Sequence, residues 1–83
     1  MTSTVRRLVS EFGGLTTPVD QLSDDADLYA AGLRSFASVQ LMLALEEAFG
    51  VEFPEQLLNR NTFGSIRSIE QVLEQLTTVR SVA

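Results

Sequence analysis

Residues 35–49 read SFASVQLMLALEEAF and carry the strongest helical pattern in the chain. Apolar side chains recur there at helical spacing on two different sides. The first stripe comprises Leu41, Leu45, Ala48 and Phe49, and the second comprises Phe36, Val39 and Leu43. A helix that is apolar on two sides must cover two surfaces. We expect the first stripe to face the core, and the second to face either more core or a docking partner.

Two further helices are expected on either side of this segment. Residues 3–13 place Val5, Leu8, Val9 and Phe12 on one face, with Thr2 or Ser3 as the cap and Gly13-Gly14 as the end. The last helix is predicted over about residues 63–78, with Thr62 as its cap. Its inner face would comprise Ile66, Ile69, Leu73 and Leu76. Fraying is expected over residues 79–83.

Between the main helix and the last one, Gly50 is the expected stop. Pro54 suits the start of a short helix over residues 55–59, with Leu57 or Leu58 facing inward. The sequence contains no strand pattern. It therefore predicts an all-α fold of three main helices plus one short helix, in a single domain over residues 1–83.

Residues 14–34 have no clean period, so a long loop is expected between the first and second helices. Apolar residues spaced along it would pin it to the core, with a helical turn near residues 25–30. The pinning residues are Leu15, Val19, Leu22, Leu28 and Leu33. Its acids, Asp20, Asp24, Asp25 and Asp27, lack the spacing of a calcium loop.

The composition of the chain excludes several classes of function. Six basic residues, all Arg, oppose eleven acidic ones, and the net charge of −5 disfavours nucleic acid and favours a partner with a basic surface. Cys and His are absent, so a disulfide, a Cys/His metal site and a self-sufficient enzyme are not expected. The longest apolar run, residues 41–45, is far too short to cross a membrane. No signal peptide pattern is present, so we expect a cytoplasmic protein. We also expect it to be a monomer.

Ser35 is the informative position because it opens the main helix. A serine there can cap the helix by accepting a backbone N–H bond. A phosphate on the same side chain would lie in the favourable field of the helix N-terminus. The position alone is compatible with a helix cap and with a residue that carries a phosphate.

The run from Asp27 to Phe36, DLYAAGLRSF, resembles the attachment motif of acyl carrier proteins, which typically reads Gly-x-Asp-Ser-Leu. The resemblance continues through VQLM, LEEAFG and Phe53-Pro54, and the order of helices matches as well. It implies an acyl-carrier-like bundle in which Ser35 carries phosphopantetheine, added from coenzyme A by a phosphopantetheinyl transferase. A prosthetic thiol would hold an acyl or aminoacyl thioester that this Cys-free chain cannot hold itself.

Three positions depart from the family pattern. Arg34 stands where the family usually has Asp, and Ala37 and Gln40 stand where acids often pair with basic enzymes. Glu46 and Glu47 remain. The weaker acidity beside Ser35 implies that enzymes of fatty-acid synthesis are not its main clients. It predicts a carrier with a dedicated ligase and a downstream acceptor enzyme.

The chain also resembles one subgroup of the family. The run GLRSFASVQLML and the later LLNR, residues 57–60, look like small standalone carriers loaded with amino acids. Their ligases are similar to truncated seryl-tRNA synthetases. This resemblance implies an aminoacyl cargo such as glycine or alanine.

Arg34 is a candidate contact for the arm's phosphate or for the ligase, or else a solvated surface residue. Eight residues are candidate partner contacts: Leu33, Phe36, Val39, Gln40, Met42, Leu43, Glu46 and Glu47. The competing interpretation is that the apolar members are core and the acids a solvated face. A rival function from another class is an unmodified helical interaction module.

Overall fold

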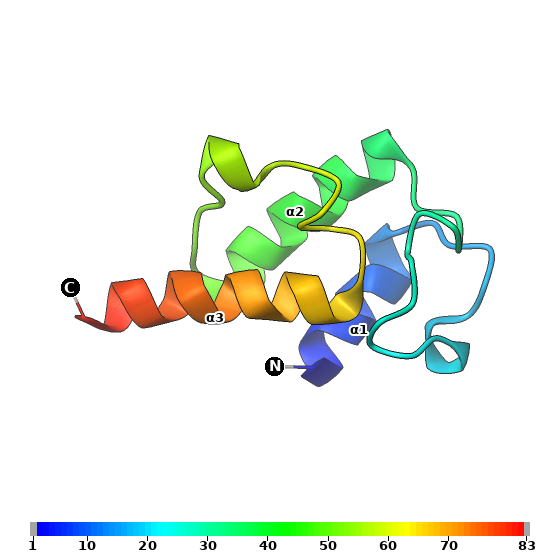
Figure 1. Cartoon of the computed structure of the whole chain (residues 1–83), viewed down its shortest axis with the longest axis horizontal. Coiled ribbons are helices and arrows are strands. Elements are labelled where there is room, and N and C mark those ends of the chain that lie inside the picture. Colours follow the sequence, from blue (N-terminus) through cyan, green and yellow to red (C-terminus); the bar gives the residue numbers. More distant parts are fainter. Residues whose placement is uncertain (1, 83) are drawn as a thin grey trace.

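A computed structural model describes the backbone of residues 2–82 and the side chains of residues 2–77. Three helices form the fold: α1 (Thr2–Phe12), α2 (Ser35–Phe49) and α3 (Ile66–Val82). Two 3₁₀ turns, η1 (Val19–Gln21) and η2 (Glu55–Leu57), lie in the connections. Helix α1 packs against both α2 and α3, and the long loop after α1 folds over the end of the bundle where α3 begins (Figure 1). The all-α prediction is confirmed.

The core gathers residues from all three helices and both long connections. Leu41 and Leu45 of α2 are fully buried, as the first stripe predicted. The other buried members are Val5, Leu8, Val9, Val19, Leu28, Leu33, Val51, Phe53, Phe63, Ile66, Ile69 and Leu73. Ala48 is exposed and Phe12 is 39% exposed, so these two assignments to buried faces were wrong. Phe12 is the last residue of α1, and Ala48 is the last but one of α2.

The long loop is ordered, as expected, and Arg6 holds its middle. The Arg6 guanidinium of α1 donates to the carbonyls of Val19 and Leu22, at 3.0 and 2.9 Å. It also pairs with Asp24 at 2.7 Å. The loop contains the 3₁₀ turn η1, and close to the helical turn expected near residues 25–30 the Ala31 N–H donates to the Asp27 carbonyl at 3.1 Å, as in one turn of a helix. The bond from Arg6 satisfies the Leu22 carbonyl, whereas the Val19 carbonyl also accepts the Leu22 N–H at 2.9 Å.

The start of α3 differs from the prediction. The helix begins at Ile66, three residues after Phe63, because Ser65 and Ser68 cap it reciprocally. The Ser65 hydroxyl accepts the Ser68 N–H, and the Ser68 hydroxyl accepts the Ser65 N–H, both at 3.1 Å. Thr62 is not the cap, since its own N–H donates to the Asn59 side chain. Phe63 instead packs in the core against Phe53, with ring centroids 5.5 Å apart.

The remaining boundaries follow the sequence closely. Gly50 ends α2 in the left-handed conformation, with φ of 64°. The predicted short helix is a single 3₁₀ turn, and of its two candidate inner residues Leu57 is half-buried and Leu58 is 45% exposed. Helix α3 continues through Val82, past the expected fray at 79, and Ala83 lies outside the described residues. None of the helices within residues 2–82 is long and apolar enough to cross a bilayer.

Candidate functional site

Ser35 is the first residue of α2, and the cap position belongs to Arg34. Arg34 has extended backbone angles, φ −112° and ψ 164°, and its carbonyl accepts the first helical bond, from the Ser38 N–H at 2.8 Å. The alternative interpretation of Ser35 as a plain helix cap therefore does not hold, because a cap residue has a non-helical backbone. Ser35 is exposed, and among the described side chains its hydroxyl has no hydrogen-bond partner.

The N-terminus of α2 is suited to an anion on that hydroxyl. Arg34 makes no side-chain cap bond, and the first turn contains no acidic residue. The leading N–H groups of a helix have no partner within the helix, and the helix dipole is positive at this end. A phosphate joined to Ser35 would therefore meet unsatisfied N–H donors, and no carboxylate in the first turn would repel it.

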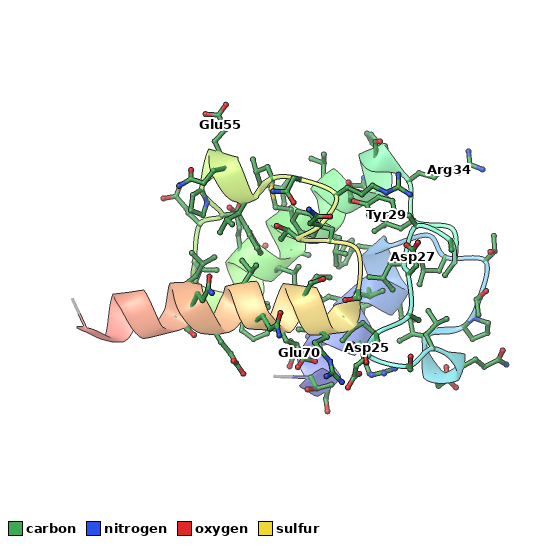
Figure 2. All side chains as sticks on the ribbon, in the orientation of Figure 1. Asp25, Asp27, Tyr29, Arg34, Glu55 and Glu70 are labelled. Atoms are coloured by element: carbon green, nitrogen blue, oxygen red, sulfur yellow. The ribbon has the colours of Figure 1, made fainter. Side chains whose placement is uncertain are left out.

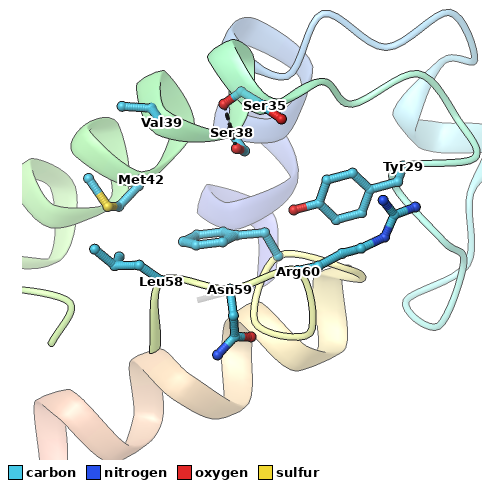
Figure 3. A pocket seen from close by; sticks show the side chains of 9 residues that line it. Tyr29, Ser35, Ser38, Val39, Met42, Leu58, Asn59 and Arg60 are labelled. Atoms are coloured by element: carbon cyan, nitrogen blue, oxygen red, sulfur yellow. Dashed lines mark hydrogen bonds between the residues drawn. The ribbon is translucent and has the colours of Figure 1, made fainter. Parts of the chain in front are cut away.

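Ser35 lies on the rim of a groove of about 440 Å³ between α2 and the two loops that precede α2 and α3. Figure 3 shows Ser35, Ser38, Tyr29 and Arg60 at one end and Met42 and Leu58 at the other. Nine residues line it: Tyr29, Ser35, Ser38, Val39, Met42, Leu58, Asn59, Arg60 and Phe63. The groove is thus polar beside Ser35 and apolar farther along α2.

Tyr29 and Arg60 form one wall of this groove. The Arg60 guanidinium carbon lies 4.3 Å from the centroid of the Tyr29 ring, in a cation–π contact. Burial raises the pKa of the Tyr29 phenol above its ordinary value, and Asp27 adds to the rise. Arg60 and the nearby Ser38 hydroxyl act in the opposite direction. Both loops are thereby tied together beside Ser35.

The second stripe of α2 faces outward. Phe36 is 76% exposed, Val39 53% and Leu43 55%. Gln40 and Glu47 are exposed on the same helix, and both line a second, smaller hollow with Leu43. Large exposed apolar side chains gathered on one helix are typical of an interaction surface. The structure therefore favours the docking interpretation of this stripe over the core interpretation.

The three remaining candidate partner contacts, and Arg34, are placed differently. Leu33 is 3% exposed, so its assignment as a partner contact was wrong: it packs in the core. Glu46 is half-buried and its Oε2 accepts the Phe53 N–H at 2.8 Å, which gives it a structural role. Met42 is half-buried and lines the groove. Arg34 is exposed, does not line the groove and points outward from the molecule (Figure 2).

Sequence reasoning did not select Tyr29, Asn59 or Arg60 as site residues. They come from two loops whose proximity depends on tertiary packing, including the bond from the Leu28 N–H to the Gly64 carbonyl at 2.8 Å. Their only signal was membership of the two runs that carried the family resemblance, around Leu28 and over residues 57–60.

Three of the four loop acids have structural partners. Asp24 pairs with Arg6 at 2.7 Å, and Asp25 pairs with Arg67 at 2.9 Å. Asp27 accepts backbone N–H groups of the turn that follows it. Among the described residues, no group of three or more His, Cys, Asp or Glu side chains is placed to hold a metal ion.

Comparison with known proteins supplies the family. The chain matches the family described as the phosphopantetheine attachment site over residues 3–76. It is 54% identical over 83 residues to an aminoacyl carrier protein of Agrobacterium fabrum, and the match covers the whole of both chains.

Two solved structures are similar throughout. One is the crystal structure of an engineered Bradyrhizobium japonicum glycine:[carrier protein] ligase complexed with a carrier protein from Agrobacterium tumefaciens and AMP. The matched chain is 59% identical with a TM-score of 0.86, and the match covers 89% of this chain and 99% of that one. The other is a solution structure of an Agrobacterium tumefaciens protein, 54% identical over all of both chains with a TM-score of 0.78.

Proposed function

Because the chain belongs to the phosphopantetheine attachment site family, we propose that Ser35 is the residue that carries the arm. The chain is a carrier protein and not an enzyme, and phosphopantetheine is its cofactor. One observation carries the assignment of Ser35: its exposed hydroxyl stands at the open N-terminus of α2, on the rim of the groove. In the modification, the Ser35 oxygen bonds to the phosphorus of coenzyme A nearest the pantetheine, and adenosine bisphosphate leaves.

The arm supplies the thiol that holds the cargo as a thioester. The chain has no Cys of its own, so its residues position the arm and present it to other proteins. The open first turn of α2 would stabilise the phosphodiester, since a helix N-terminus favours negative charge. The exposed side chains Phe36, Val39 and Leu43 would form the surface that partners recognise.

We further propose that the cargo is an aminoacyl group, with glycine as the first candidate. A carrier protein 59% identical to this chain is found with a glycine:[carrier protein] ligase. The 54% identical Agrobacterium fabrum protein is an aminoacyl carrier protein. The partners would then be a phosphopantetheinyl transferase, an amino acid ligase and a downstream acceptor. The carrier would work as a single-domain monomer in the cytoplasm, where coenzyme A is available.

The test is the intact mass of the chain before and after incubation with coenzyme A, magnesium and a broad-specificity phosphopantetheinyl transferase. The expected result is a gain of one phosphopantetheine that is lost in Ser35→Ala. Ser38→Ala is the matched control, because Ser38 lines the same groove three residues further along α2 and should leave the gain intact. A gain retained in Ser35→Ala, or no gain from the folded parent, would refute the assignment.

A second step tests the cargo. Holo protein would be incubated with ATP and either glycine with a glycine:[carrier protein] ligase or a fatty acid with a fatty acid:carrier protein ligase, and its mass measured again. We expect a glycyl adduct and no fatty acyl adduct. The reverse pattern would leave the carrier assignment standing and overturn the aminoacyl cargo.

A further inference from the structure

Arg60 is the single positive charge among the nine residues that line the groove, and no carboxylate lines it. Within residues 2–77, the ion pairs join Arg6 to Asp24 and Arg67 to Asp25, and Arg60 belongs to neither. Its guanidinium makes no hydrogen bond to any described residue. Its N–H donors are therefore available, although the side chain itself is held by a specific contact.

That contact fixes where the free charge lies. Arg60 packs on the Tyr29 ring at 4.3 Å, at the same end of the groove as Ser35 and Ser38 (Figure 3). Arginine stacks readily on aromatic rings because its charge is delocalised and weakly hydrated. A stacked guanidinium loses less conformational freedom when it then binds an acceptor. The wall of the groove thus presents a preorganised cation beside the attachment residue.

We propose that Arg60 binds the phosphodiester at the root of the phosphopantetheine arm. This inference rests on the proposed attachment at Ser35. A phosphodiester brings one negative charge and two free oxygens, which match the planar donor fork of arginine. Arg60 and the open first turn of α2 would contact the phosphate from two sides. Arg34 is next to Ser35 in sequence, but its side chain points away from the groove.

The first experiment uses the unsubstituted chain. NMR spectra of the arginine Nε–H groups would be recorded for the apo protein and for the holo protein made with coenzyme A and the transferase. The Arg60 resonance is expected to shift on attachment of the arm, whereas that of Arg7, an exposed residue of α1, stays in place. An Arg60 resonance at the same position in both forms would overturn the proposal.

The second experiment compares holo variants by phosphorus NMR. In Arg60→Gln the phosphodiester resonance is expected to move towards its position in the urea-unfolded chain, and Arg60→Lys should move it less. Arg34→Gln and Arg7→Gln remove the same charge elsewhere and should leave the resonance at the parent position. A parent-like resonance in Arg60→Gln, or an equal movement in Arg34→Gln, would refute the role of Arg60.

The two proposals fail in different ways. If the folded parent gains no phosphopantetheine mass, the attachment at Ser35 fails, and this inference fails with it. If holo protein forms normally and the phosphorus resonance is the same in the parent and in Arg60→Gln, only the contact with Arg60 is refuted. Amide spectra of each variant would establish that the helical bundle is unchanged.

Discussion

The guanidinium of Arg60 lies over the ring of Tyr29, 4.3 Å from its centroid, and so connects the loop before α2 to the loop before α3. These loops are about thirty residues apart in sequence. Ser35 begins the helix that follows the first of them, and all three residues line one groove. The contact therefore links the segment that leads into Ser35 to the opposite wall of the groove.

Tyr29 provides a direct probe of this contact, because it is the one tyrosine in the chain. Burial raises its pKa, so neutral phenol is favoured in the folded state. The stability that the neutral phenol gives the folded state is complete at pH values below the unfolded pKa of about 10. It is lost as the pH rises through the raised pKa of the folded state. Arg60→Gln removes a charge that lowers the pKa, so ultraviolet titration of this variant should give a higher pKa than the parent. An unchanged or lower value would contradict the electrostatic role of Arg60, and Arg34→Gln is the control.

Gly32 should tolerate no side chain. Its φ is 118°, and an added Cβ would lie 2.8 Å from the Thr16 nitrogen. Gly32→Ala should lower the free energy of unfolding by roughly 1–3 kcal/mol from backbone strain, with the clash added to it. Gly14→Ala is the matched control, since its φ is 61° but its Cβ would meet open space. It should cost about 1 kcal/mol. Urea denaturation of both variants tests the difference, and equal losses would contradict it.

The exposed and buried stripes of α2 should separate binding from stability. Phe36→Ala, at a 76% exposed position, should change the free energy of unfolding by less than about 0.5 kcal/mol. It should weaken binding to the ligase by more than about 1 kcal/mol, as an apolar anchor would. Leu41→Ala, at a fully buried position, should instead destabilise the fold by roughly 2–5 kcal/mol. Calorimetric titration and urea denaturation give the two readouts. Parent-like ligase affinity in Phe36→Ala would exclude this stripe from the interface.

Both ends of α2 could be predicted from the sequence because each end has a strong local pattern. Apolar periodicity starts at Phe36, and Gly50 takes the left-handed angle that the end of the helix requires. The start of α3 was misplaced because Phe63 and Ile66 fit one helical face equally well. The boundary is set by the reciprocal bonds between Ser65 and Ser68, which compete locally with the helix.

Only the part of the candidate site that lies on a single helix could be predicted from the sequence. Ser35 and the exposed stripe lie on one helix, where spacing alone relates them. Tyr29 and Arg60 meet across the groove only after the long loop has packed, through Leu28 and the Arg6 contacts, onto the core. Spacing along the sequence carries no information about such a contact. The sequence also suggested Arg34 as the positive charge that contacts the phosphate, because only residues next to Ser35 in the sequence could be considered for that role.

Arg34→Asp restores the residue that acyl carrier proteins usually have before the serine, and the structure predicts opposite effects on folding and loading. Arg34 occupies the cap position with an extended backbone and makes no side-chain cap bond. Aspartate is among the best cap residues and its charge suits the helix N-terminus, so the variant should gain about 1 kcal/mol of stability. Loading by a cognate ligase should nevertheless be slower, because Arg34 is the exposed charge next to Ser35, the proposed attachment residue.

Urea denaturation and the kcat/KM of ATP-dependent glycine loading would be measured on holo Arg34→Asp. Arg34→Gln is the matched control, since it removes the positive charge without adding a strong cap. We expect slower loading in both variants and higher stability in the aspartate variant. A greater stability accompanied by parent-like loading would show that Arg34 is a solvated surface residue and takes no part in recognition by the ligase.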